Sequence, residues 1–285
     1  MEDRALADLR LPMKKSKKNM GNFQKSRITE IIGRIPYRMA FAGGWIDQPF
    51  VSRHNPTPPG SMVVVAIEPT LRFMDRCGMG TSTRKIAINI WDDQLPDRSP
   101  VDLVKELYAA ENEGQPAPSG SQDMAGIIYP GVSRLDYDFE HEGGYFPVNV
   151  LSNTNHEVAR WLENHIYVVP VVQRASGYDP LEEKNLDPVW IQRLGQTGKD
   201  CFNAIVEKDA LALGQSMNEC MLCWEKILPN TVRHRSILLD LVKLLSHYQK
   251  KYFGGMYSGC GGGYIYVVSD EPVPGGFQIK IRLPA

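Results

Sequence analysis

The chain has 285 residues, of which 42% are hydrophobic and 23% charged, and its formal net charge is −1. This composition is typical of a globular protein with ample apolar material for a core. The balanced charge argues against a dedicated nucleic-acid-binding protein, which would carry a basic excess. Because no apolar run reaches about 18 residues, we expect no membrane-spanning segment. The five cysteines are scattered and odd in number, which argues against a disulfide framework and favours a cytoplasmic location.

Residues 1–27 form a predicted polar extension. They show no sustained periodicity, lack the apolar stretch of a secretory signal and carry Lys14, Lys15, Lys17 and Lys18. A solvated tail is the simpler interpretation. A basic arm that steers a polyanion is the alternative.

The next part of the chain predicts strands, loops and one clear helix. A strand that runs into a loop at Gly43-Gly44 is expected within 31–50, and a buried β-branched strand follows from residue 61, with a turn at Pro69. A glycine-rich loop opens into a helix-like run over 78–91. Apolar residues recur with helical spacing over 101–113. A loop over 116–123 then leads into a segment, 124–139, that we expect to be rich in strand.

The second half is expected to begin with a strand over 165–172. A long helical stretch follows over 190–228, with a break near Gly214, and then an amphipathic helix over 237–253. A glycine-rich turn enters a strand within 256–270, and an alternating strand closes the chain over 276–284. Because helices and strands mix without regular β-α-β alternation, the sequence predicts an α+β protein with two lobes. We place an N-terminal domain at 28–155 and a C-terminal domain at 156–285.

Three glycine-rich points stand out: Gly43-Gly44, Gly78–Thr83 and Gly259–Gly263. Glycine lets the backbone turn sharply and approach a ligand closely. The middle segment has the strongest chemistry, because its turn would place free backbone N–H groups at a helix N-terminus, where phosphate binds well. Its hydroxyl side chains suit phosphate oxygens or Mg²⁺. The alternative is a loop that only caps the helix. The segment matches neither a Walker A loop nor a dinucleotide fingerprint.

Two carboxylates occupy useful positions after this loop. Glu111 lies near the end of the predicted helix, and Asp123 lies in the loop over 116–123. A phosphoryl-transfer site needs a metal held by carboxylate and hydroxyl groups, a phosphate cradle and a group that orients the acceptor hydroxyl. Ser82, Glu111 and Asp123 could supply these parts. Each of them, taken alone, also fits an ordinary surface position.

Four segments stand in an order that resembles a known family. Pro36–Pro49 reads Pro-x-Arg-x-x-Phe-Ala-Gly-Gly-x-x-Asp-x-Pro, and the others are Gly78–Thr83, Glu111 with Gly120–Asp123, and Ser258–Tyr264. Gln173–Ser176 is a fifth segment with a weaker match to the same order. Over about residues 33–285 this order resembles the GHMP kinases, the family of galactokinase, homoserine kinase, mevalonate kinase and phosphomevalonate kinase, and above all its heptose kinase and fucose kinase branch.

The resemblance implies a two-lobed α+β fold with a ribosomal-S5-like N-terminal lobe and a ferredoxin-like C-terminal lobe. The N-terminal lobe is expected to be trimmed, because Asp47 and Gly78 stand closer in this sequence than in the family. The implied activity is an ATP- and Mg²⁺-dependent transfer of phosphate to a hydroxyl of a sugar or sugar phosphate, with the anomeric hydroxyl as a candidate. The implied partner is a small-molecule substrate, and a homodimer is compatible with this interpretation.

The resemblance also implies roles for single residues. Asp123 is the base or orienting group for the acceptor hydroxyl, and Arg38 stabilises charge near the transferred phosphoryl group. Ser82 and Glu111 hold Mg²⁺. The remaining residues are ligand contacts: Gly78, Met79, Gly80, Thr81, Ser82 and Thr83 for the triphosphate, and Gly43, Gly44, Trp45, Asp47, Gly261 and Gly262 for the acceptor side.

Three questions stay open at this point. Arg84 and Lys85 either contact phosphate or face solvent. The acceptor is a sugar or a non-sugar alcohol such as an amino acid. The protein is either a catalytically active kinase or a non-catalytic regulator that binds a nucleotide or a sugar.

Overall fold

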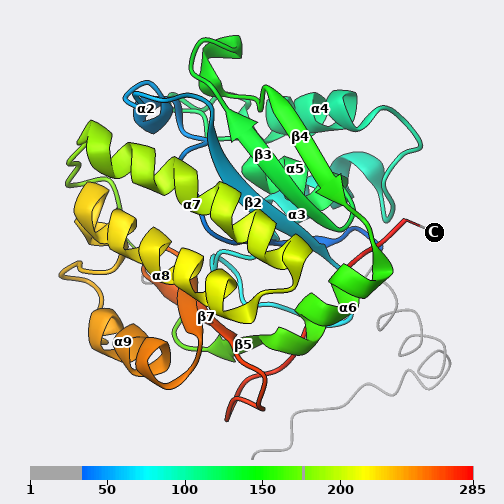
Figure 1. Ribbon diagram of the computed structural model, residues 1–285. Coiled ribbons are helices and arrows are strands. Elements are labelled where there is room, and N and C mark those ends of the chain that lie inside the picture. The colour runs from blue at the N-terminus through cyan, green and yellow to red at the C-terminus, as the bar shows by residue number, and fades with distance from the viewer. Residues whose placement is uncertain (1–33, 175–176, 285) are drawn as a thin grey trace, which may run out of the picture. The chain divides into compact units, whose positions relative to one another are not determined.

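Two antiparallel sheets and the helices packed on them make up the part of the chain that the computed structural model describes, residues 34–174 and 177–284 (Figure 1). The predicted polar extension over 1–27 lies outside the described residues. Residues 34–285 form one compact unit. The α+β class predicted from the sequence is confirmed.

The first sheet has the strand order β1-β2-β3-β4. Its strands are Tyr37–Ala40, Gly60–Ile67, Val132–Tyr137 and Asn149–Asn153. All eight residues of β2 are buried, because α5 packs on one face of the sheet and α7 packs on the other (Figure 1). The β-branched run therefore forms a buried strand, as predicted.

The helices of the first half are α2 (Pro49–Ser52), α3 (Thr81–Trp91), α4 (Pro100–Asn112) and α5 (Gln122–Ile128), with a short 3₁₀ turn at Glu142–Gly144. The helices predicted over 78–91 and 101–113 are present as α3 and α4. The strand-rich prediction for 124–139 is wrong in its first part, because residues 124–128 belong to α5. All five are buried, and a short apolar run that is buried all round has no periodicity to distinguish helix from strand.

The second sheet has the order β5-β7-β6, with strands Ile166–Pro170, Gly262–Val268 and Gly254–Gly259. Helix α6 (His156–His165) leads into it. The predicted final strand over 276–284 is not a regular strand. It makes two isolated bridges instead, Phe277 with Val168 of the second sheet and Ile281 with Ile67 of the first. This segment therefore ties the two sheets together.

Helices α7 (Pro188–Glu207), α8 (Ala210–Ile227) and α9 (Leu241–Lys251) cover the sheets, and a 3₁₀ turn at Pro229–Thr231 follows α8. The predicted break near Gly214 is wrong. The helix stops at Lys208, which adopts the left-handed conformation, and Asp209 caps α8 by accepting a hydrogen bond from the Ala212 N–H. Gly214 lies inside α8, where a Cβ would sit 2.3 Å from the Phe253 carbonyl oxygen. Close packing on β6, and not helix breaking, explains this glycine.

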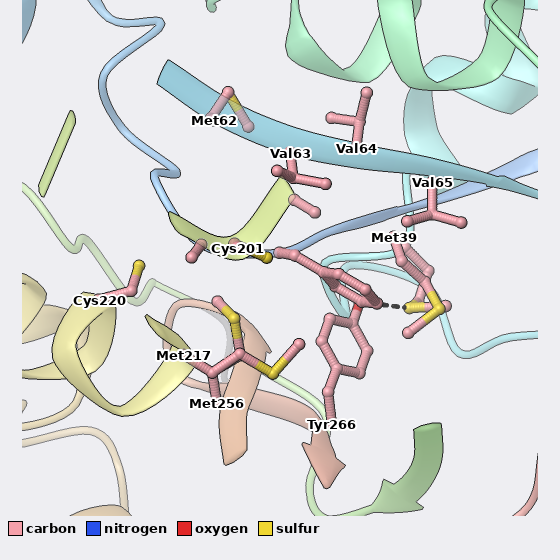
Figure 2. Packing of buried hydrophobic residues seen from close by; sticks show 14 of the residues in the cluster. Met39, Met62, Val63, Val64, Val65, Cys201, Met217, Cys220, Met256 and Tyr266 are labelled. Atoms are coloured by element: carbon pink, nitrogen blue, oxygen red, sulfur yellow. Dashed lines mark hydrogen bonds between the residues drawn. The ribbon is translucent and has the colours of Figure 1, made fainter. Parts of the chain in front are cut away.

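The two sheets share one apolar core. Met39 and Val65 of the first sheet, Met256 and Tyr266 of the second, and Met217 of α8 belong to the same buried cluster (Figure 2). The chain passes from one sheet to the other between Asn153 and Ile166, near the expected boundary at 155/156. Separate domains at 28–155 and 156–285 stay a prediction.

The cysteines and the search for membrane-spanning helices bear on two expectations from composition. The five cysteines are free thiols and all are buried. Within residues 34–174 and 177–284, no helix is both long and apolar enough to cross a bilayer.

Candidate active site

A cavity of about 370 Å³ collects most of the residues that the motifs single out. Its walls come from β1, the N-terminal turns of α3 and α5, the β6–β7 hairpin and α8. The lining residues from the predicted set are Arg38, Gly44, Trp45, Gly78, Gly80, Thr81, Ser82 and Asp123. A larger and more open hollow of about 760 Å³ lies over residues 182–183 and 230–242, and its lining includes none of the predicted site residues.

The glycine-rich loop places the start of α3 at this cavity. Gly78 has φ +78°, and Gly80, the N-cap of α3, has φ +65°, a backbone region that favours glycine. No side chain caps this N-terminus, so the first-turn N–H groups are left for a ligand. Together with the positive end of the helix dipole they make an anion-binding site. Ser82 is exposed at the cavity, whereas Thr83 is fully buried.

The second sheet holds this loop in place. Ser258 donates a hydrogen bond to the Cys77 carbonyl oxygen, and the Met74 N–H donates to the Tyr264 hydroxyl at 3.0 Å. Met79 is fully buried, and its sulfur accepts from the Tyr266 hydroxyl at 3.0 Å. Met79 therefore supports the loop from the core, and its side chain faces away from the cavity.

Arg38 and Asp123 form the charged centre of the cavity. Arg38 donates to the Gly78 carbonyl oxygen at 2.9 Å and forms an ion pair with Asp123. The second carboxylate oxygen of Asp123 accepts from the Thr83 hydroxyl at 3.3 Å. Burial lowers the pKa of Arg38, and the nearby Asp47 and Glu111 oppose that shift. Both oxygens of Asp123 are thus oriented while 28% of its side chain stays exposed.

Glu111 carries a polar atom that the protein leaves unpaired. Its Oε2 is buried with no hydrogen-bond partner, an arrangement that is unfavourable unless a donor or a cation arrives. Burial raises the pKa of this carboxyl, whereas a hydrogen bond from Thr83 and the charge of Arg38 lower it. Among the described residues no cluster of three or more His, Cys, Asp or Glu side chains could hold a metal. One carboxylate and one hydroxyl suit Mg²⁺, which keeps waters and takes phosphate oxygens as its other ligands.

Asp47 lies behind the cavity wall. It is fully buried, and its carboxylate accepts from the Gln122 amide at 3.2 Å and from the Gln48 amide at 3.5 Å. A Cβ added at Gly120 would lie 1.9 Å from Asp47 Oδ2, so the 116–123 loop covers the carboxylate. Burial raises the pKa of Asp47 to about 6, against the opposing effect of Arg38. Gln48 and Gln122 line the cavity where the sequence led us to expect Asp47.

The other residues predicted on the acceptor side divide into two groups. Gly44 and Trp45 line the cavity beside Trp224, with the two indole centroids 6.5 Å apart. Trp45 has φ +82°, a strained conformation for a bulky residue. Gly43 instead donates its N–H to the Cys220 sulfur at 3.3 Å in the core.

The glycines of the β6–β7 turn also differ from the prediction. A Cβ at Gly261 would meet the Tyr178 ring at 2.9 Å, and one at Gly262 would meet Val172 at 2.9 Å. Gly261 therefore packs against Tyr178 and Gly262 against Val172, while the preceding residues Ser258, Gly259 and Cys260 line the cavity.

Arg84 and Lys85 have different surroundings in the structure. Arg84 is buried, donates to the Ile35 carbonyl oxygen at 2.8 Å and lies over the Tyr37 ring. Lys85 is exposed and forms an ion pair with Asp75 at 2.8 Å. Neither belongs to the cavity wall.

Several lining residues carry no role in the sequence-based prediction, above all Arg76, Arg174 and Trp224. Arg174 stands in the weakly matching segment 173–176, so a signal existed there, but nothing in that pattern tells where the side chain points. Gln122 was part of a motif and received no role of its own.

Comparisons with known proteins find similarity in fold and none in sequence. No sequence-family model matches the chain, and no curated protein is similar to it in sequence. Solved structures are similar in fold. Lactococcus lactis galactokinase complexed with galactose has a TM-score of 0.60 at 11% identity, over 93% of this chain and 99% of that one. A mevalonate kinase has a TM-score of 0.57 at 12% identity, over 88% of this chain and 99% of that one.

A third similar structure is a D-glycero-D-manno-heptose 1-phosphate kinase from Bacteroides thetaiotaomicron. Its TM-score is 0.52 at 12% identity, over 87% of this chain and 95% of that one. These neighbours are GHMP kinases, so the resemblance found in the sequence is confirmed at the level of the fold. The chain has the two-lobed α+β fold of a GHMP kinase.

Proposed function

We propose that the protein is an ATP- and Mg²⁺-dependent kinase that phosphorylates a hydroxyl of a sugar or sugar phosphate. One observation carries the proposal. A single cavity holds an uncapped helix N-terminus and, beside it, a partly exposed carboxylate whose two oxygens are both oriented. An anion site next to an oriented base is what phosphoryl transfer to an alcohol requires.

The donor phosphates fit the N-terminus of α3, where the N–H groups of residues 81–83 and the Ser82 hydroxyl can donate hydrogen bonds. Ser82 and Glu111 would hold Mg²⁺, and the unpaired Glu111 Oε2 supports that fit. Mg²⁺, when bound, supplies positive charge that neutralises the phosphates. The second sheet supports this arrangement, because it holds the backbone at Met74 and Cys77, directly before the loop.

Asp123 is the group that we assign to the acceptor hydroxyl. Arg38 and Thr83 fix its two oxygens, so the carboxylate can accept the hydroxyl hydrogen in a defined direction as the oxygen attacks phosphorus. Arg38 has a double contact, with Asp123 and with the Gly78 carbonyl oxygen. It therefore fixes the separation between the base and the phosphate loop.

A sugar is favoured as acceptor by the uncharged residues of the cavity wall. Trp45 and Trp224 provide apolar faces for a sugar ring. Gln48 and Gln122 provide amide groups that can both donate to and accept from hydroxyls. Two of the similar structures are named as kinases of galactose and of a heptose 1-phosphate. A cytoplasmic location and a homodimer stay predictions.

The test is ADP release from MgATP with a panel of aldoses, sugar phosphates, polyols and hydroxy amino acids. We expect turnover with a sugar or sugar phosphate, and a loss of about 10²–10⁴-fold in Asp123→Asn. The matched control is Asp200→Asn, which makes the same change on the exposed surface of α7.

The other outcomes separate the alternatives. Turnover with a hydroxy amino acid alone would replace the sugar by a non-sugar alcohol. ATP binding without turnover on any acceptor would indicate a binding regulator. A chain that binds no ATP would refute the phosphate-loop assignment and the kinase with it.

A further inference from the structure

The charges that line the cavity do not balance. Arg38 is paired with Asp123, but Arg76 and Arg174 also line the cavity. Neither has a carboxylate partner within the described part of the chain. Two guanidinium groups that face one cavity without a counter-charge favour an anionic ligand with more than one charge.

Arg174 is the better oriented of the two. Its Nε donates to the Cys260 carbonyl oxygen at 2.9 Å, and its guanidinium lies 5.5 Å from the Tyr178 ring centroid. Tyr178 is itself fixed, because its hydroxyl donates to the Asn230 carbonyl oxygen at 2.7 Å. These contacts hold one edge of the guanidinium plane and leave the two terminal nitrogens for a ligand. A planar group fixed in this way suits paired hydrogen bonds to phosphate oxygens.

The terminal nitrogens lie beside the phosphate loop. A Cβ added at Gly259 would be 3.0 Å from the Gly78 Cα and 3.4 Å from Arg174 Nη2. A single methyl group at Gly259 would therefore contact both the Arg174 guanidinium and the loop at Gly78. Arg174 belongs to the segment that follows β5, which ends at Pro170, whereas the loop continues directly into α3 at Thr81.

We propose that Arg174 is a further catalytic residue, which binds the oxygens of the phosphoryl group in transfer beside the loop that opens α3. This inference rests on the proposed function. In the step, the bond between the donor's bridging oxygen and the terminal phosphorus breaks, and a bond from the acceptor oxygen to that phosphorus forms. The hydroxyl proton goes to Asp123, and ADP leaves. Arg174 offsets the negative charge on the phosphoryl oxygens throughout.

Two variants and one control test the role. Arg174→Gln removes the charge, and Arg174→Lys keeps the charge but loses the planar pair of donors. Arg160→Gln, on the exposed surface of α6, makes the same charge change away from the cavity. With MgATP and the acceptor found in the panel, we expect kcat to fall about 10²–10³-fold in Arg174→Gln. We expect partial recovery in Arg174→Lys and no change in Arg160→Gln.

A binding measurement tests the role of Arg174 independently of the proposed kinase activity. Titration calorimetry with inorganic tripolyphosphate should show at least about tenfold weaker binding to Arg174→Gln than to wild type. AMP, which lacks the β- and γ-phosphates, should bind both equally. The melting temperature of Arg174→Gln should stay within about 2 °C of wild type, so that lost folding does not imitate lost binding.

Each contrary result has one meaning. If wild type turns over and Arg174→Gln matches it within threefold, the role of Arg174 is refuted and the kinase stands. If only the acceptor KM rises, Arg174 binds an anionic group of the acceptor, and the proposal is again wrong. If wild type binds neither ATP nor tripolyphosphate, both proposals fall. If tripolyphosphate binds through Arg174 without turnover on any acceptor, the catalytic role is refuted and only an anion site remains.

Discussion

Asp123 and Asp47 both interact with Arg38, but the structure gives them opposite surroundings. Asp123 is partly exposed at the cavity and keeps both oxygens in fixed hydrogen bonds. Asp47 is fully buried beneath Gly120, and burial raises its pKa. One carboxylate is placed to meet a ligand, and the other is placed to hold Gln122 at the wall. A prominent acid in a motif can therefore support a site without contacting what binds there.

The largest expected effect separates the two acids by activity. Asp123→Asn should lower kcat by about 10²–10⁴-fold, because the amide cannot accept the hydroxyl proton. Asp47→Asn should lower it less than about tenfold, because the amide keeps a similar shape and can still accept from Gln122. Steady-state kinetics on both variants would measure this. The comparison fails if Asp47→Asn raises the acceptor KM a hundredfold at unchanged kcat, since that result would place Asp47 in contact with the acceptor.

The second effect concerns the cover over Asp47. Gly120→Ala should reduce the free energy of unfolding by about 3 kcal/mol, because the new methyl group has to displace the Asp47 carboxylate. Chemical denaturation measures the change. Gly114→Ala is the control in the same region: its φ is +70° and a Cβ there meets nothing within 4 Å. The free energy of unfolding of Gly114→Ala should fall by only about 1 kcal/mol, because of backbone strain. If the free energy of unfolding falls equally in the two variants, Gly120 does not pack tightly on Asp47.

The smallest effect is a pH dependence. The folded-state pKa of Asp47 is raised to about 6 from 3.8, so between these values the folded protein binds the proton more tightly than the unfolded chain does. The stability that this group contributes is therefore present at low pH and is lost as the pH rises through 6. Relative to Asp47→Asn, wild type should lose about 1 kcal/mol between pH 5 and pH 7. The free energy of unfolding is measured for both proteins at each pH. If it changes by the same amount in both between pH 5 and pH 7, the burial of an ionisable Asp47 is contradicted.

The sequence predicted the fold class and the helix that follows the glycine-rich loop, because Gly78 to Thr83 carry glycine and hydroxyl residues that mark a helix start within a few positions. It did not predict the helix that begins beside Asp123, because the short apolar run of α5 is buried all round and has no periodicity. The burial of Asp47 depends on Gly120 and Gln122, the latter 75 residues away in sequence. The direction of Arg174 depends on the Cys260 carbonyl oxygen, 86 residues away. Pairings over such separations leave no periodic trace in a single sequence.

The attachment of the glycine-rich loop to the second sheet has a consequence for the order in which the protein is made. Met79 rests on Tyr266, which follows it by 187 residues, and Cys77 is held by Ser258, 181 residues later. Contacts of such long range form slowly. During synthesis, the loop leaves the ribosome long before the strands that shape it exist. A nascent chain that has not yet reached Ser258 therefore lacks a finished wall for this cavity, however much of the first sheet has already folded.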